Sequence, residues 1–461
     1  MSAAGPAAHA APQPSWGSHQ SWSTQHNKSV LLPVLGLVAM AVPGLFVLGI
    51  VSTNIGVSAV IVGAFAAVVP VVVIVAAILW VDRWEPEPSW MLLTAFLWGA
   101  SVAVFAASFV NDSAYVLGEL VLGAGGGLLV GPVISAPIAE EAFKGLFLLG
   151  LLWFRRREFD GLVDGIVYAG LVAAGFAFTE NILYFGRAFA SDGLAGEGGG
   201  VLAVFLIRGL LSPFAHPLFT SLIGLAAGIA AGSRSTGTKI LVLIGGYLGA
   251  VVLHALWNAS AGYGLLLIVY PLIMVPLFGC LVAMVVWQRH REQRVVAAQL
   301  PGFAAAGWIA PSEVGLLASM AGRRGWRAAV RRRAGDAAAA AVRDYQTAVT
   351  ELAFLRHRMA RGTVAYEAGR WHHEVLGALM AARARAVGAP NALGSAWRLP
   401  PPSGWSAPQN VLPPTSAGGF VLPHPPGQPG RYLPYPQQPM QSDPVGLPTM
   451  PGGYPPPPPG R

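Results

Sequence analysis

Three glutamates and two histidines lie inside apolar segments of this chain, where ionisable groups are costly. Glu140 and Glu141 are adjacent in the run Ala-Pro-Ile-Ala-Glu-Glu-Ala-Phe-Lys, and Glu180, His216 and His254 lie in three separate segments further along. An ionisable group at membrane depth costs roughly 2.5–3.5 kcal/mol on insertion scales. Carboxylates and imidazoles are also the side chains that activate water, transfer protons and bind metal ions. We therefore expect carboxylates and imidazoles to converge within roughly 10 Å in one hydrated cavity.

The two adjacent carboxylates are suited to acid–base chemistry. Neighbouring positions on a helix point about 100° apart, so only one of Glu140 and Glu141 can face the centre of a site. Lys144 lies four residues after Glu140 on the same face and can offset one carboxylate. Two close carboxylates in a low dielectric titrate unequally, so identical side chains can serve as base and proton donor. The alternative is a buried pair that fixes helix packing against Lys144.

The other polar groups lie on faces that could complete such a site. Glu180 is followed by Asn181, and His216 lies between two prolines that are expected to kink their helix and open it to water. His254 and Asn258 are four residues apart and share a helix face, so they could bind a metal, position water or stabilise an oxyanion. The alternatives are an interfacial polar cap, a histidine bonded to a carbonyl, and hydrogen bonds between helices.

The elements that carry these residues are predicted to be membrane-spanning helices. Mean hydropathy is +0.55, and charged residues are only 11% of the chain. We predict an all-α polytopic bundle of about eight spans, each long enough to cross a bilayer. The predicted spans are 31–51, 56–81, 90–110, 117–154, 162–186, 201–232, 239–260 and 263–288, and glycines near 123–127 could interrupt the fourth.

Charge in the short connections predicts the orientation. Basic residues follow the fourth span, separate the sixth from the seventh and follow the eighth, whereas the intervening connections are poor in Lys and Arg. This pattern predicts a multi-pass protein of the cell membrane with both termini cytoplasmic. The net charge of +8 is then explained by anionic lipid and indicates no nucleic-acid partner. The single cysteine, Cys280, excludes a disulfide within the chain.

Composition divides the chain into four regions. Residues 1–29 are polar and are predicted to be a disordered lead, and residues 30–290 form the transmembrane domain. Residues 295–388 are rich in Ala and Arg at helical spacing, which predicts amphipathic cytoplasmic helices. Residues 389–461 are rich in Pro and Gly and are predicted to be a disordered tail, to which a proline-recognising partner could bind.

The set of motifs resembles the PrsW family of intramembrane proteases, within the wider CAAX-protease and bacteriocin-processing clan. The matching elements are Glu140-Glu141-x-x-Lys144, Phe176-x-x-x-Glu180, the embedded His216, His254-x-x-x-Asn258, Asp82-Arg83-Trp84-Glu85-Pro86-Glu87-Pro88 and the run from Glu158 to Gly165. The resemblance covers about residues 30–290 and implies cleavage of membrane-bound protein substrates. The founding member acts on an anti-sigma factor, and a long C-terminal extension with Ala, Gly and Arg bias resembles actinobacterial members.

The resemblance implies roles for six residues but leaves the chemistry open. Glu140 and Glu141 would activate water, Glu180 and His216 would ligate or orient it, and His254 with Asn258 would bind metal or stabilise the oxyanion. In a metal-dependent reaction, Glu141, His216 and His254 would hold Zn²⁺. A metal-free reaction with a glutamate as base is about equally compatible with the sequence.

Two other functions use similar residues. A proton-coupled transporter or channel also places carboxylates and histidines in the membrane, but it would be favoured by an inverted repeat with paired broken helices, which the sequence does not show. A catalytically inactive scaffold that recruits partners through its tail is the third interpretation, and the intact residue set argues against it.

Overall fold

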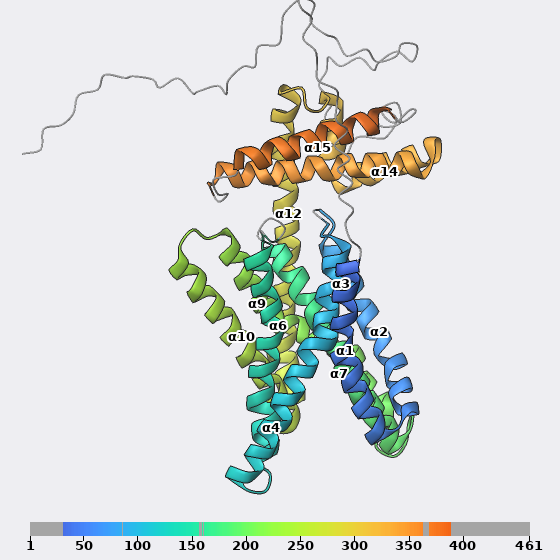
Figure 1. Ribbon diagram of the computed structural model, residues 1–461, viewed down its shortest axis with the longest axis vertical. Helices are drawn as coiled ribbons and strands as arrows, with labels where there is room; N and C mark the ends of the chain where they lie inside the picture. Colours follow the sequence, from blue (N-terminus) through green and yellow to red (C-terminus); the bar gives the residue numbers. More distant parts are fainter. Residues whose placement is uncertain (1–30, 85, 156–158, 160, 363–367, 389–461) are drawn as a thin grey trace, which may run out of the picture. The chain divides into compact units, whose positions relative to one another are not determined.

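The computed structural model describes residues 31–84, 86–155, 159, 161–362 and 368–388. This described part is built from helices and the connections between them, which confirms the all-α prediction (Figure 1). The predicted disordered lead and Pro-rich tail lie outside it, as do Glu85, Glu158 and Asp160 of the two flanking motifs.

The helices follow one another in a simple order along the chain. Their bounds are α1 Leu31–Ile55, α2 Val57–Val81, α3 Ser89–Leu97, η1 Trp98–Ala103, α4 Val104–Leu122, α5 Gly126–Leu129, η2 Val130–Ser135, α6 Ala136–Phe154, α7 Leu162–Asp192, α8 Gly200–Val204, η3 Phe205–Leu211, α9 Ala215–Gly232, α10 Thr236–Gly262, α11 Leu266–Val269, η4 Tyr270–Met274, α12 Val275–Ala305, η5 Pro311–Glu313, α13 Val314–Leu317, α14 Met320–Ala360 and α15 Ala368–Gly388. The segments η1 to η4 are π-helical, a rare geometry that often accompanies functional sites.

Among the described residues, seven helical segments are long and apolar enough to cross a membrane. They include a continuous stretch from Ser89 to Leu122, so the predicted connection at 111–116 is wrong. The predicted span 117–154 is instead divided after Leu122, where Gly123 and Gly125 have φ of 81° and 89°. Glycine adopts this left-handed region without the cost that a Cβ imposes. The helix α6 that follows carries three charged residues and is not among the seven.

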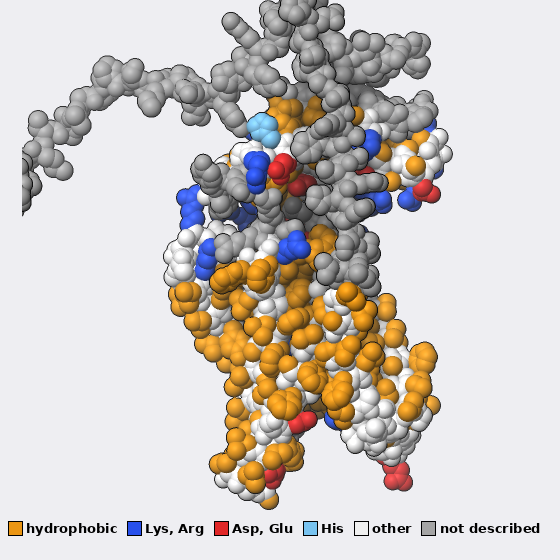
Figure 2. Space-filling view, viewed as in Figure 1, with side chains coloured by type: hydrophobic (Ala, Val, Ile, Leu, Met, Phe, Trp, Pro, Cys, Tyr) orange, Lys and Arg blue, Asp and Glu red, His pale blue; other side chains and the backbone are white. Residues whose placement is uncertain are grey.

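The helix α7 is the centre of the bundle. Of its most apolar stretch of 18 residues, 83% is buried. It packs against α2, α9 and η1. A Cβ on Gly99 of η1 would collide with the backbone of Val172, and one on Gly165 of α7 would collide with the backbone of Gly224 in α9. Small residues of this kind let membrane helices approach closely. Around this core, Figure 2 shows hydrophobic side chains over most of the visible face of the bundle.

A helix break precedes His216, and a change from π-helix to α-helix precedes Glu140. Helix α9 begins at Ala215 after a turn at Ser212–Phe214, so the predicted distortion around His216 is confirmed as a break. Pro137 lies where the π-helical segment η2 passes into α6, and the backbone stays helical from Gly126 to Phe154. Glu140 follows about one turn later on α6.

Residues 296–388 build a second hydrophobic core. Helix α12 continues from its apolar half into this region, and α14 and α15 pack against each other (Figure 1). Buried members of the core include Leu300, Trp326, Tyr345 and Leu352. Trp84, from the connection between α2 and α3, is also part of it. The extension is therefore joined to the bundle through packing as well as through the chain.

Candidate active site

Lys144 lies at the centre of the polar cluster. Its side chain is fully buried, and its ammonium is 2.9 Å from Glu141 Oε1, 3.4 Å from Glu140 Oε2 and 3.1 Å from His216 Nδ1. An ammonium has three N–H donors, and each has one acceptor here. The Nζ atom also lies 4.0 Å from the centre of the Phe176 ring, which adds a cation–π contact. Lys144 therefore links residues of α6, α7 and α9.

Glu141 is the most enclosed carboxylate of the cluster. Besides Lys144, it accepts a hydrogen bond from Thr220 Oγ1 at 2.8 Å, and its Oε1 lies 3.0 Å from His254 Nδ1. The His254 ring stacks on Phe219 at 4.9 Å between centroids. With Nδ1 held by a carboxylate, the Nε2 atom of His254 is directed towards Glu140, 3.8 Å away. Glu141 thus orients a histidine rather than facing open space.

Glu180 orients the ring of His216, as Glu141 orients that of His254. Its Oε2 atom lies 2.8 Å from His216 Nε2. The same carboxylate forms an ion pair with Arg208 of η3, whose Nε donates to Asn181 Oδ1 at 2.9 Å. The guanidinium also lies 3.9 Å from the Tyr184 ring centre. Glu180 is the more accessible acid, with its side chain 19% exposed.

Glu140 is held more loosely than Glu141. Asn111 Nδ2 donates to Glu140 Oε1 at 3.4 Å, and Ser135 Oγ donates to the Asn111 side chain at 2.9 Å. Asn111 Nδ2 and Lys144 Nζ each lie 3.4 Å from an oxygen of Glu140, which is long for a charge-assisted hydrogen bond. Glu140 is thus the carboxylate with the most freedom to engage a further group.

Five of the six predicted site residues come together. The rings of His216 and His254 are 5.2 Å apart and nearly perpendicular, and the contacts above connect them to Glu140, Glu141 and Glu180. The expected convergence is confirmed. Asn258 lies outside the cluster, because its Nδ2 donates to the backbone carbonyl of Pro132 at 2.8 Å. It holds the π-helical segment that leads into α6, and its predicted role at an oxyanion stays a prediction.

Sequence reasoning missed three side chains that contact the clustered glutamates, namely Arg208, Thr220 and Asn111. Arg208 is an ionisable residue in the predicted span 201–232, which is the signal that identified the glutamates and histidines. Thr220 gives no such signal, because hydroxyl side chains are common between membrane helices. Its importance follows only from its hydrogen bond to Glu141.

One group among the described residues could hold a metal ion. Donor atoms of Glu140, His216 and His254 all lie within 4.8 Å of one another. Each histidine has its other nitrogen against a carboxylate, a common arrangement for zinc ligands. The donor types therefore fit zinc, although Lys144 contacts two of the three donors and would have to keep only its bond to Glu141. The sequence had suggested Glu141 in the place that Glu140 takes in this group.

The cluster lies far from the basic ends of its helices. Glu140 precedes the end of α6 by about 14 residues, and His216 precedes the end of α9 by about 16. Glu180 and His254 are each about 18 residues from the starts of α7 and α10. At about 1.5 Å per residue, the site lies roughly 21–27 Å along the helices from these basic ends. The cluster is therefore well separated, along all four helices, from the ends nearest the extension.

Comparison with known proteins agrees with the motifs. Residues 87–288 match a family model described as PrsW family intramembrane metalloprotease, a range that contains every candidate site residue. The match confirms the resemblance to the PrsW family and, with the apolar helices, identifies a membrane protein.

Curated relatives named Protease PrsW are similar to part of the chain. The one from Geobacillus kaustophilus (strain HTA426) is 32% identical over 167 residues, which are 35% of this chain and 64% of the relative. The one from Bacillus subtilis (strain 168) is 34% identical over 147 residues, 32% of this chain and 59% of the relative. The chain thus spans less than two thirds of these relatives. No solved structure was found to match the chain.

Proposed function

We propose that the bundle is an intramembrane endopeptidase that hydrolyses peptide bonds of membrane-bound protein substrates. The observation that carries this proposal is the single buried cluster in which Glu140, Glu141, Glu180, His216 and His254 meet around Lys144. A cluster of acids, imidazoles and cations supplies the base, the proton donor and the positive charge that hydrolysis needs. Similarity to proteins named Protease PrsW supports the reaction class.

In this proposal Glu140 activates the attacking water. Glu140 is held more loosely than the adjacent Glu141, and the Nε2 atom of His254 lies 3.8 Å from its Oε2 atom. Glu141 and Glu180 are positioning residues, because each fixes the ring of one histidine. Lys144 supplies a positive charge at the centre of the cluster, where an oxyanion would develop.

The same residues accommodate a metal-dependent reaction. Glu140, His216 and His254 would hold a zinc ion, which lowers the pKa of bound water and polarises a carbonyl. Glu141 and Glu180 would then orient the two histidine ligands. The family description as metalloproteases favours this version, and the bonds from Lys144 to two of the donors favour the metal-free one.

We further propose that both termini face the cytoplasm and that cleavage occurs in the outer half of the bilayer. Basic residues such as Arg155, Arg234, Lys239 and Arg291 gather at the helix ends nearest the extension, as the positive-inside rule requires of a cytoplasmic face. The cluster lies towards the opposite face. The substrate class is therefore membrane-anchored proteins whose susceptible bond lies near the outer interface, and a regulatory anti-sigma-type protein is one candidate.

The test is proteolysis in a defined bilayer. The purified full chain is reconstituted with a panel of single-span proteins that carry a tag at each end, with and without chelator. Glu140→Gln is expected to abolish the appearance of cleaved fragments, whereas Glu197→Gln, at an exposed glutamate between α7 and α8, should leave it unchanged. Equal cleavage by wild type and Glu140→Gln would overturn the assigned base. Proton flux without any cleaved substrate would favour the transporter instead.

A further inference from the structure

A large cavity lies away from the candidate active site. Its volume is about 1060 Å³, and it is bounded by the basic ends of α6, α7, α9 and α10, by α12 and by the last turn of α14. None of the clustered glutamates and histidines lines it. The chemistry of its walls therefore requires a separate account.

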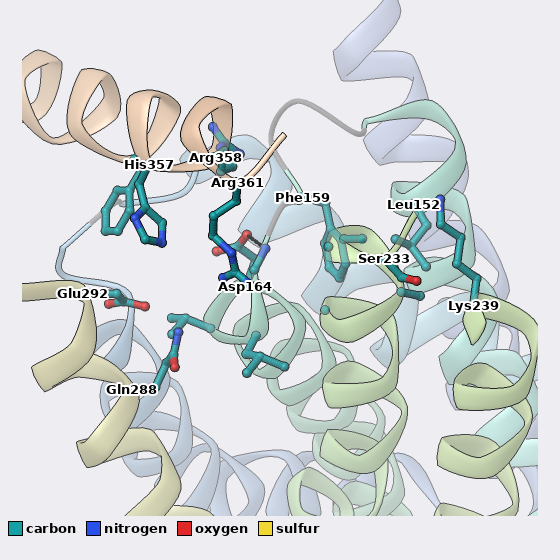
Figure 3. A pocket seen from close by; sticks show the side chains of 18 of the residues that line it. Leu152, Phe159, Asp164, Ser233, Lys239, Gln288, Glu292, His357, Arg358 and Arg361 are labelled. Atoms are coloured by element: carbon teal, nitrogen blue, oxygen red, sulfur yellow. Dashed lines mark hydrogen bonds between the residues drawn. The ribbon is translucent and has the colours of Figure 1, made fainter. Parts of the chain in front are cut away.

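Basic side chains dominate the polar part of the wall. The charged residues that line the cavity are Arg234, Lys239, Arg291, Arg358 and Arg361, against Asp82, Asp164 and Glu292. Figure 3 shows Arg361 extending from the end of α14 into the cavity and Lys239 at its other side. The excess of positive charge at a membrane boundary is suited to an anionic group. Arg234 donates to the backbone carbonyls of Arg361 and Gly362, which connects the α9–α10 turn to α14.

The remaining wall is apolar and continues onto the lipid-facing surface. Leu149 and Trp153 of α6 and Ile240 of α10 line the cavity, yet these side chains are 43%, 75% and 54% exposed on the bundle. Helices α6 and α10 pack against each other, so the apolar strip follows their shared edge. A ligand could thus hold an anionic head inside the cavity while its hydrocarbon chains remain in the bilayer.

One buried polar atom indicates that the headgroup of the ligand carries a hydroxyl. Among the described residues, the side-chain oxygen of Gln288 is buried without a hydrogen-bond partner. Gln288 lines the same cavity (Figure 3). A buried amide oxygen without a partner is costly. Because this oxygen is closed to solvent, the Gln288 side chain has to turn towards the cavity to accept a hydrogen bond from a ligand hydroxyl.

We propose that this cavity binds an anionic phospholipid with a hydroxylated head, of the phosphatidylglycerol type. The anionic head lies between Arg361 and Lys239, which attract its phosphate from the two sides of the cavity. Gln288 accepts a hydrogen bond from the head, and the acyl chains follow the edge between α6 and α10. Because Arg361 belongs to the extension and Lys239 to the bundle, the bound lipid also fastens these two parts together. Free phosphate would use the same cations but would leave the apolar wall and Gln288 without a role.

The test measures binding by the purified, delipidated full chain in detergent. Phosphatidylglycerol, phosphatidylcholine and inorganic phosphate are titrated separately, and bound lipid is counted by native mass spectrometry alongside the shift in melting temperature. We expect saturable binding of phosphatidylglycerol and a rise in melting temperature, with neither effect from phosphatidylcholine or phosphate. The double variant Lys239→Gln/Arg361→Gln should bind phosphatidylglycerol at least tenfold more weakly, since each basic residue near a headgroup contributes about a factor of five.

A charge-matched control removes two positive charges elsewhere. Arg332→Gln/Arg385→Gln changes exposed positions of α14 and α15 that do not line the cavity, and it should bind like wild type. Equal loss in both double variants, equal binding of phosphatidylcholine, or a full response to inorganic phosphate would each overturn the proposal. If the first double variant does not fold, Lys239→Gln alone provides the comparison, because Lys239 is only half-buried. No readout depends on proteolysis, so this test is independent of the proposed function.

Discussion

Replacing Lys144 by methionine should destabilise the bundle strongly. Lys144 is fully buried and contacts two carboxylates and a histidine. Methionine fills a similar volume and keeps the contact with Phe176, so the main change is the loss of a positive charge. Glu140 and Glu141 then remain buried without the cation that offsets them.

The magnitude follows from breaking a buried ion pair. Removal of one partner from such a pair costs about 3–5 kcal/mol, because it leaves an uncompensated buried charge. For a domain of this size, 1 kcal/mol corresponds to about 2–4 °C in Tm, so the expected decrease is roughly 6–20 °C. The matched control is Arg332→Met, at an exposed arginine of α14 outside the cavity, where a surface substitution costs about 0.5 kcal/mol or less.

The assay is thermal unfolding of the purified full chain in one detergent, followed by intrinsic fluorescence. A decrease for Lys144→Met no larger than that for Arg332→Met would refute the reasoning that Lys144 neutralises the cluster. Adding zinc separates the two mechanisms. If Glu140, His216 and His254 bind the metal, zinc should recover much of the lost stability in Lys144→Met, because a divalent cation replaces the ammonium. A metal-free cluster would show no recovery.

Three further predictions concern neighbouring contacts. Thr220→Val should cost about 1–3 kcal/mol and lower turnover, because Glu141 loses a buried donor, whereas Thr220→Ser should restore both in unfolding and cleavage assays. Burial raises the pKa of Asp82 to about 7 from 3.8, so its contribution to stability is largest below about pH 4 and is lost as pH rises through 7. Asp82→Asn should flatten the change in melting temperature between pH 5 and 8, and an unchanged slope would contradict this. Trp84→Ala should cost the core around Trp84 about 3–5 kcal/mol and increase hydrogen exchange in α14, with Trp80→Ala on the exposed face of α2 as the control.

The sequence predicts well which side chains converge, because an ionisable residue in an apolar segment is costly and therefore conspicuous. Each of Glu140, Glu180, His216 and His254 could be identified without knowing which helices are neighbours. Their partners could not be identified, because pairing depends on how the helices pack. The ion pair between Glu180 and Arg208 is one example. It joins α7 to the π-helical segment η3, which no sequence pattern predicted.

Helix boundaries were harder to predict at the end of α4 and the turn that follows it. Asn111 and its polar neighbours resembled a connection between spans, but they continue α4. The Asn111 side chain contacts Glu140 and Ser135, so its polarity serves the cluster rather than solvent. Composition alone does not distinguish a polar loop from a polar contact within a helix. The glycines at 123–125 were the more reliable signal for the turn.

The position of Asn258 shows a limit of inference from helical spacing. Residues four apart share a face, so the sequence placed Asn258 beside His254. They also differ in depth by about 6 Å along the helix axis. That distance brings His254 into the cluster and leaves Asn258 at the backbone of Pro132. Shared direction is therefore insufficient evidence for shared chemistry when the site occupies a thin layer of the membrane.

The charges of the cluster explain why one set of residues accommodates two mechanisms. Three carboxylates, those of Glu140, Glu141 and Glu180, face two fixed cations, Lys144 and Arg208. Burying a net negative charge is costly, so one further positive charge is needed for neutrality. A proton held by a histidine or a carboxylate supplies it in a metal-free reaction and can then be delivered to the leaving amine. A divalent ion on Glu140, His216 and His254 would supply two positive charges where one is needed. Whether such an ion displaces Lys144 from Glu140 and His216 is therefore the measurement that separates the two mechanisms.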